Sequence, residues 1–281
     1  MGFGCNACGI SGCRIIDSPR ERLIGILTNN FVPCNGRFPI LIAIITMFFT
    51  VDMKQPLKTV SAVVLLMSII IFGICMTLII SQVLSRTVLK GVPSTFALEL
   101  PPYRRPQIGK VIIRSVFDRT IFVLGRAAAV AAPAGLVIWL LANISVSGES
   151  LMGWVAGALD PIARVIGLDG VILMAFILAL PANEIVFPII IMSYLSMGSL
   201  TEITNLTLLR NLLVENGWTW VTAACTMLFS LCHFPCATAL WTVAKETHSF
   251  KWTAASFLIP TACGVVICFI VASVARIFSL I

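Results

Sequence analysis

The sequence predicts an all-α polytopic membrane protein with five or six transmembrane segments, at least one of them a broken helix. Apolar residues make up 59% of its 281 residues and charged residues only 11%, and the mean hydropathy is +1.03. Soluble domains carry about a quarter charged residues, so this chain cannot cover a water-facing surface with polar side chains. Its apolar residues fall into long runs typical of membrane-spanning helices, and several runs contain proline, which breaks a helix.

The first half of the chain predicts two full spans, one short apolar run and two surface helices. Residues 1–37 include an amphipathic pattern that favours a helix on the membrane surface. The run 38–51 is short for a span, so it is tilted, extended upstream or re-entrant. Residues 60–85 form a full span, the basic and proline-rich linker 86–119 ends in a second surface helix, and residues 121–141 span again.

Three apolar stretches follow, at residues 165–197, 219–243 and 253–281. The first is interrupted by a proline-containing segment at residues 181–184, and the second by another at residues 232–236. Proline removes a backbone hydrogen bond from a helix interior. We therefore expect a break in each of these two stretches.

The net charge of +7 reflects membrane topology rather than a nucleic-acid site. Of the nineteen Lys and Arg residues, four lie in residues 1–37 and seven in residues 86–120. Clusters of basic residues beside spans mark cytoplasmic segments. Residues 143–160 hold Glu149 and Asp160 but no Lys or Arg, which places them outside. The expected surroundings are a lipid bilayer, and no nucleic-acid partner is expected.

The topology of the last third depends on how residues 165–197 cross the membrane. If they form a hairpin or two short passes, Lys245 and Lys251 fall on the cytoplasmic side. If they cross once, both lysines fall outside. We favour the hairpin because it keeps basic residues inside.

Glu184 is the most informative residue in the sequence. It lies between two apolar runs, where an ionised carboxylate costs about 2.5 kcal/mol or more at mid-bilayer. In a helix, Pro188 would leave the carbonyl of residue 184 without a partner, and Pro181 would do the same to Ile177. Free carbonyls beside a carboxylate suit a cation, so Asn183, Pro181 and Pro188 are expected to form a path or hinge. The alternative is a short extramembrane turn with a solvated Glu184.

A second candidate site is the sequence Cys-His-Phe-Pro-Cys at residues 232–236. On a helix, Cys232 and Cys236 would share a face, and the hinge residue Pro235 would free the carbonyl of Leu231. Thiolate and imidazole from Cys232, Cys236 and His233 suit Fe²⁺, Zn²⁺ or Cu⁺. The alternative is ordinary packing, with His233 hydrogen-bonded inside the protein.

Cys5, Cys8 and Cys13, with Cys34 further on, form a third candidate site. Their spacing could begin a zinc or iron–sulfur site, although no structural zinc pattern continues after Cys13. Transient thiolate ligands or close helix packing are the alternatives. The ten cysteines are expected to be reduced, because the basic end of the protein faces the cytosol.

The chain offers little for enzymatic catalysis. It contains no Walker-type phosphate loop, and with two histidines and no paired carboxylates it lacks a convincing hydrolytic site. An enzyme is therefore not expected.

Several motifs together resemble the ferrous iron transport protein B (FeoB) family. In the order of that family they are Gly-Phe-Gly-Cys-Asn-Ala-Cys-Gly at 2–9, the stretch at 20–34 ending in Val-Pro-Cys, Glu-Leu-Pro-Pro-Tyr-Arg at 99–104, Pro-Ala-Asn-Glu-Ile-Val at 181–186, His-Phe-Pro-Cys at 233–236 and Phe-Lys-Trp-Thr at 250–253. The resemblance covers essentially the whole chain.

The resemblance implies the permease portion of an Fe²⁺ importer in the bacterial inner membrane, with Fe²⁺ as the transported ion. In the family, a GTPase domain and a first gate repeat precede the part that this chain resembles, so no GTP site is expected here. These two parts are expected as partners, in the same longer chain or in a separate one, and a homo-oligomer is expected. The resemblance also matches Cys5 and Cys236 to thiols that face the iron path, and Glu184 to the acidic position of a broken helix.

The resemblance divides the chain into four parts. Residues 1–60 are the central cysteine-containing segment, 61–114 a transmembrane helix with its basic linker, 115–245 the second gate-type domain, and 246–281 a C-terminal transmembrane helix. Two other functions remain open: a gate-type membrane protein for nucleosides or small solutes, and a non-transporting metal-binding membrane subunit. An iron–sulfur redox protein is a more distant alternative.

Overall fold

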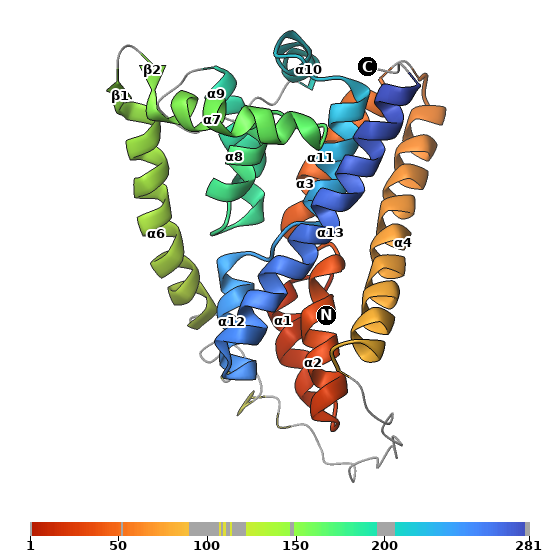
Figure 1. The fold of residues 1–281 in the computed structure, drawn as a ribbon, viewed down its shortest axis with the longest axis vertical. Coiled ribbons are helices and arrows are strands. Elements are labelled where there is room, and N and C mark those ends of the chain that lie inside the picture. The colour runs from red at the N-terminus through yellow and green to blue at the C-terminus, as the bar shows by residue number, and fades with distance from the viewer. Residues whose placement is uncertain are drawn as a thin grey trace.

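The computed structural model describes residues 2–51, 53–89, 107, 109–110, 113, 122–146, 149–195 and 206–278. Within these residues the chain is a bundle of helices that run mostly parallel or antiparallel to one long axis (Figure 1). The helices are α1 (Asn6–Gly12), α2 (Pro19–Thr28), α3 (Phe38–Ile44), α4 (Leu57–Arg86), α6 (Phe122–Asn143), α7 (Leu151–Val165), α8 (Gly170–Leu178), α9 (Val186–Tyr194), α10 (Leu206–Glu215), α11 (Trp220–Cys232), α12 (Ala237–Thr247) and α13 (Phe250–Ile277). Two short strands, β1 (Ser145–Val146) and β2 (Glu149–Ser150), pair antiparallel beside α6.

Four candidate spans are found among the described residues: Pro19–Phe49, α4, Trp220–Thr247 and α13. A fifth is reached if α7 and α8, which meet at 109°, count as one bent span. Helix α6 runs along much of the same axis (Figure 1), although the apolar part counted there, Ala128–Asn143, is shorter. The chain is therefore an all-α, multi-pass membrane protein with broken helices, as the sequence predicts.

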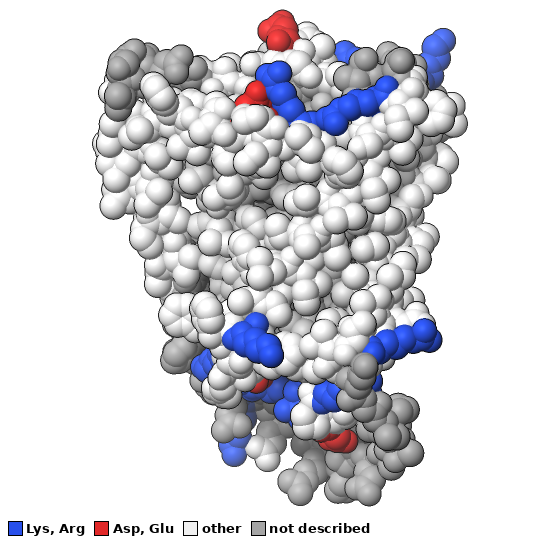
Figure 2. All heavy atoms as spheres, in the orientation of Figure 1, with Lys and Arg blue, Asp and Glu red and all other residues white. Residues whose placement is uncertain are grey.

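On the face shown in Figure 2, charged side chains gather at the two ends of the bundle, with an uncharged band between them. Arg14 forms an ion pair with Glu246, and Arg20 donates to the carbonyl oxygen of Ser85. These contacts bring the N-terminal basic segment, the end of α4 and the end of α12 together at one end. Lys245 lies beside Glu246 at that end, which the basic residues mark as cytoplasmic.

The course of α8 and α9 explains this topology. Helix α8 enters from the opposite end, and α9 returns to it, so the two form a hairpin (Figure 1). Residues 165–197 therefore do not cross the membrane once. The hairpin alternative is the one found.

The N-terminal segment differs from its prediction. Helix α2 does not lie on the membrane surface but leads through a 3₁₀ turn toward α3, within the single candidate span Pro19–Phe49. Its Ile26 and Leu27 are buried, and α2 packs against α4 and α13. The short run 38–51 is thus extended upstream. The second predicted surface helix, near residues 108–117, falls largely outside the described residues.

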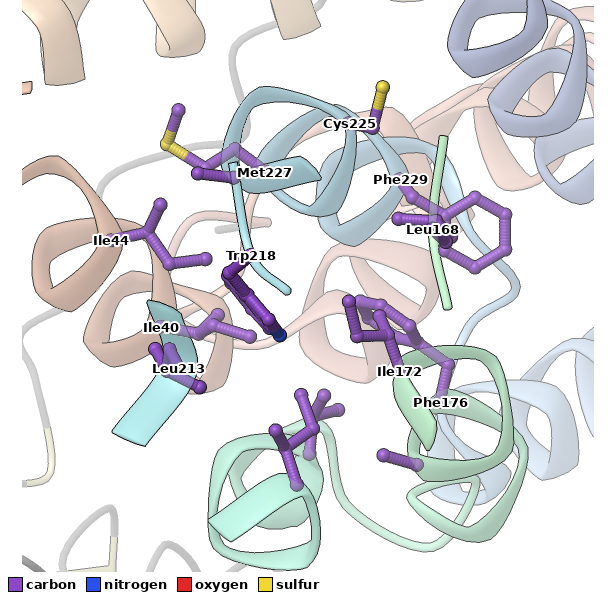
Figure 3. Close-up of a cluster of buried hydrophobic side chains, with 14 of the residues drawn as sticks. Ile40, Ile44, Leu168, Ile172, Phe176, Leu213, Trp218, Cys225, Met227 and Phe229 are labelled. Carbon is purple, nitrogen blue, oxygen red and sulfur yellow. The ribbon is translucent and has the colours of Figure 1, made fainter. Parts of the chain in front are cut away.

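The main apolar core lies between α3, α8 and α11 (Figure 3). Phe176 of α8 and Phe229 of α11 meet edge to face, with ring centroids 5.0 Å apart. Trp218, just before α11, is 3% exposed and stacks on Phe48. This packing fixes the hairpin of α8 and α9 against the crossing helix α11.

The outer end of the hairpin is held by a close backbone approach and a polar chain. A Cβ at Gly170, the first residue of α8, would lie 2.0 Å from the carbonyl oxygen of Ala156 in α7, so only glycine fits. The Asp169 carboxylate caps α8 by accepting from the amide of Ile172 at 2.6 Å. The Tyr194 hydroxyl donates to the other carboxylate oxygen of Asp169, which ties the end of α9 to the start of α8.

Candidate functional site at two helix breaks

Two helix breaks meet in the middle of the bundle. Helix α8 ends at Leu178 and α9 begins after a 3₁₀ turn at Asn183–Ile185. Helix α11 ends at Cys232 and α12 begins at Ala237. The backbone amide of Ala237 donates to the carbonyl oxygen of Leu180 at 2.7 Å. The two interrupted stretches predicted from sequence therefore contact each other through their backbones.

Pro181 acts differently from the prediction at the first break. The carbonyl of Ile177 accepts from the amide of Leu180 at 3.3 Å, so Pro181 does not leave it free. Pro188 is the third residue of α9, where an amide has no partner within the helix in any case. Proline is therefore tolerated there, and the break ends in a normal helix start.

Glu184 is exposed and packs against the turn that precedes α3. A Cβ at Gly36 would lie 2.9 Å from the Cγ atom of Glu184 and 3.2 Å from its Oε1 atom. Glycine at position 36 thus gives Glu184 the room that it occupies. The carboxylate lies at the break, beside the N-terminal segment.

Asn183 connects the two breaks through its side chain. It is 7% exposed, and its Oδ1 atom lies 3.3 Å from Nε2 of His233. Its amide nitrogen lies 3.8 Å from the sulfur of Cys34. Asn183 therefore links α9's entry turn, the α11–α12 break and the segment before α3.

His233 is a buried, hydrogen-bonded residue. Its Nδ1 atom lies 2.8 Å from the carbonyl oxygen of Ser230, and its Nε2 atom lies 3.3 Å from Oδ1 of Asn183. Both oxygens only accept, so the ring nitrogen that carries the proton decides which of the two is hydrogen-bonded. Aromatic rings of Phe176, Phe229 and Phe234 surround the imidazole. His233 could bind a metal only if Asn183 moved away.

Cys232 and Cys236 do not share a helical face, contrary to the prediction. Cys232 ends α11 and Cys236 precedes α12, with extended backbone between them. Pro235 lies in this extended segment rather than inside a helix. Instead, Cys236 directly precedes Ala237, whose amide contacts the α8–α9 break.

Arg37 occupies the α11–α12 break and was not predicted as a site residue. Its side chain is 0% exposed. Its Nη1 atom donates to the carbonyl oxygens of Leu231 at 2.8 Å and Asn30 at 2.9 Å. Its Nη2 atom donates to Oδ1 of Asn30 at 3.2 Å and to the carbonyl of His233 at 3.4 Å. The carbonyl of Leu231, expected to be free, is thus paired with a guanidinium.

Asn30 completes this arrangement from the same N-terminal segment. Its amide nitrogen donates to the carbonyl oxygen of His233 at 2.6 Å, while its Oδ1 atom accepts from Arg37. The sequence did contain a signal for Arg37, since an arginine directly before an apolar run is costly unless it is paired or solvated. Its position at the end of the basic segment 1–37 predicted a cytoplasmic arginine instead of a buried one.

The N-terminal cysteines run along α1 from the turn before α3, where Asn35 donates to the carbonyl of Gly4, toward the cytoplasmic end near Glu246. Cys5 precedes α1, Cys8 lies within it, and Cys13 follows it. Burial raises the pKa of Cys13, and Glu246 raises it further, so this thiol is protonated at neutral pH and is a poor metal ligand. Its sulfur donates to the carbonyl of Gly9 at 3.4 Å.

The described residues contain no group of three or more His, Cys, Asp or Glu side chains placed to hold a metal ion. The predicted ligands Glu184, Cys236 and His233 are brought to one region but not to one point. No disulfide links the ten cysteines, all of which lie in the described part of the chain. The site is therefore a set of polar groups around two breaks rather than a preformed metal centre.

Comparison with known proteins shows what this chain is similar to. A family model described as "Ferrous iron transport protein B C terminus" matches residues 66–118. The chain is 29% identical to "Fe(2+) transporter FeoB" of Staphylococcus aureus strain MSSA476, over 99% of this chain and 40% of that protein. It is 26% identical to the protein of that name from Campylobacter jejuni, over 98% and 45% of the two chains. For the one from Methanocaldococcus jannaschii the identity is 27%, over 90% and 37%.

These relatives are all longer than the region that matches. The chain spans about two fifths of the length of the curated relatives, since it covers 40% and 45% of the first two. No solved structure matches it significantly. The matches cover nearly all of this chain, and the matched family model describes a C-terminal region. The chain is therefore similar to the C-terminal membrane portion of ferrous iron transport protein B.

Proposed function

We propose that this chain forms the membrane-permease part of an Fe²⁺ importer in the cell (inner) membrane. The observation that carries the proposal is the contact between the two helix breaks, where the Ala237 amide donates to the Leu180 carbonyl. Broken helices at mid-membrane give transporters polar backbone groups for an ion. An exposed carboxylate, Glu184, lies at this break, and the relatives described above are named Fe²⁺ transporters.

In this proposal, Glu184 and the thiols of Cys236 and Cys34 replace part of the hydration shell of Fe²⁺. Sulfur and nitrogen ligands suit Fe²⁺ better than they suit Mg²⁺, which prefers sites made of oxygen atoms. Asn183 and the prolines 181, 188 and 235 form the hinge that lets the breaks separate. Cys232 and His233 become ligands only after the break rearranges, because both are buried.

In this proposal Cys5 joins the thiols at the break, because the neighbouring Gly4 carbonyl accepts from the Asn35 amide in the turn before α3, and Cys8 follows one turn along α1. The transported ion is the substrate, and the chain itself is not proposed to be an enzyme. In the family the energy source is a GTPase domain, so this domain and a first gate repeat are proposed partners, together with a second copy of the chain.

Glu184→Gln tests the proposal because it removes the charge and keeps the size. The change is made in the native gene in its own host, so that the chain is tested in whatever complete form the host makes. We expect iron uptake by the cells to fall by about tenfold or more, with an unchanged amount of protein in the membrane. The matched control is Glu215→Gln, since Glu215 is an exposed carboxylate at the end of α10.

Unchanged uptake in the Glu184→Gln cells would favour the metal-binding subunit that does not transport. Loss of nucleoside or small-solute uptake with normal iron uptake would favour the small-solute gate. A fall in iron uptake in the Glu215→Gln cells as well would mean that surface charge, rather than the break, controls transport.

A further inference from the structure

Arg37 is a charged side chain in the middle of the bundle that has no contact with solvent. It is 0% exposed and lies within the candidate span Pro19–Phe49. A guanidinium stays charged in proteins. Burial of such a charge requires compensation from hydrogen bonds or an opposite charge.

The compensation comes from backbone oxygens at the helix break. The carbonyls of Leu231, His233 and Phe234 accept from Arg37 at 2.8, 3.4 and 3.5 Å. Oxygen atoms released from a helix are the groups that hold cations in broken-helix transporters. The guanidinium thus sits where a cation would sit, and it uses the same oxygens.

The compensation is incomplete in two respects. The Nε atom of Arg37 is buried and has no hydrogen-bond partner. No ion pair in the described residues includes Arg37. Glu184 packs against the adjacent residue Gly36 and forms no ion pair with the arginine. Among the described residues, the guanidinium is therefore held by carbonyl and amide oxygens alone.

We propose that Arg37 is a resident cation that keeps the α11–α12 break closed, and that an ion can use this break only when the guanidinium leaves the carbonyl oxygens. The inference rests on the proposed function for the identity of the transported ion. The closed state itself is defined by Arg37 and does not depend on that identity. Cys34 lies three residues before Arg37, and Cys232 and Cys236 flank the segment between α11 and α12, so these thiols report whether the break is open.

The test compares Arg37→Gln with Arg37→Lys in the native gene. Both substitutions keep a side chain that donates to carbonyls, but only lysine keeps the charge. Membranes are treated with a small water-soluble thiol-alkylating reagent, and mass spectrometry measures labelling at Cys34 and Cys236. Arg20→Gln is the matched control, because Arg20 donates to the carbonyl of Ser85 at the cytoplasmic end instead.

We expect Arg37→Gln to raise the labelling rate by about tenfold or more, and Arg37→Lys and Arg20→Gln to leave it near that of the unmodified protein. Equal labelling of the Gln and Lys variants would overturn the proposal, because a merely structural clamp does not depend on charge. If Arg37→Gln does not accumulate, Asn30→Ser replaces it. The shorter side chain withdraws the Oδ1 acceptor from Arg37 and the amide donor from the His233 carbonyl, so labelling should rise above the unmodified level, and no rise would overturn the proposal.

Iron uptake by the same cells separates this inference from the proposed function. If labelling follows the expected pattern while none of the strains imports iron, Arg37 closes the break as proposed, but the proposed transport of Fe²⁺ is wrong. If uptake depends on Glu184 but labelling does not respond to the charge at position 37, the proposed iron import is supported, but the proposed role of Arg37 is wrong.

Discussion

Each of the two helix breaks contains a proline, but the breaks differ in how their polar groups are satisfied. The α8–α9 break reverses the chain and leaves the Glu184 carboxylate exposed. The α11–α12 break continues across the bundle, and its carbonyls are buried and paired with Arg37. The α8–α9 break therefore presents an exposed carboxylate, whereas the α11–α12 break contains a buried guanidinium.

The difference teaches that proline predicts a break but not its electrostatics. The partner of each break comes from the N-terminal segment, far away in sequence. Gly36 makes room for Glu184 at the first break, and the next residue, Arg37, fills the second. Two neighbouring residues in the turn before α3 thus contact the two breaks, Gly36 the first and Arg37 the second.

The largest expected effect comes from a substitution that disrupts the packing of the α8–α9 hairpin. In Gly170→Ala the new Cβ would lie 2.0 Å from the backbone oxygen of Ala156, and backbone cannot move aside locally. We expect a loss of about 3 kcal/mol or more of folding free energy. The amount of folded protein in membranes and its melting temperature in detergent measure this loss.

Gly157→Ala is the control for that prediction, because a Cβ there meets nothing within 4 Å. Alanine favours a helix over glycine by about 0.8–1.0 kcal/mol, so this variant should be as stable as the original or slightly more so. Similar losses in both variants would mean that the close approach of α7 and α8 does not hold the hairpin.

Local sequence patterns predicted the spans and both breaks because hydropathy and proline act within a short stretch of chain. The span predicted at residues 60–85 is α4, and the interruptions at 181–184 and 232–236 are the two breaks. The residues that satisfy the breaks could not be predicted in this way. Arg37 and Leu231 are 194 positions apart in the chain, and only tertiary packing brings them together.

The candidate site was predicted in part for the same reason. Glu184 was found because a carboxylate between apolar runs is unusual wherever the chain folds. The pairing of Cys232 with Cys236 was wrong because it assumed a continuous helix, whereas the extended segment at Phe234 and Pro235 separates them. The role of Cys34 depends on contact with Asn183, which no local pattern contains.

A smaller effect is expected from a substitution that shifts the Glu184 carboxylate and leaves residue 184 itself unchanged. In Gly36→Ala the Cβ would lie 2.9 Å from Cγ of Glu184, so the carboxylate must shift while the fold remains. We expect reduced iron uptake with a change in stability of about 1 kcal/mol. In a double-mutant cycle with Glu184→Gln, the second substitution should add little, because both act on the same group. Additive losses would mean that Gly36 acts on transport by another route.

The smallest expected effect separates the two breaks from each other. Ala237 is the first residue of α12, where proline fits a helix, and the extended backbone of Cys236 (φ −62°, ψ 159°) is compatible with a following proline. Ala237→Pro therefore removes the amide that donates to Leu180 and little else. We expect a loss of about 1 kcal/mol in stability, measured by melting in detergent. Phe250→Pro, at the exposed first residue of α13, is the matched control and should lose less. Faster thiol labelling of Cys236 in Ala237→Pro alone would show that this backbone bond keeps the breaks together, whereas equal labelling in the two variants would mean that the breaks are held independently.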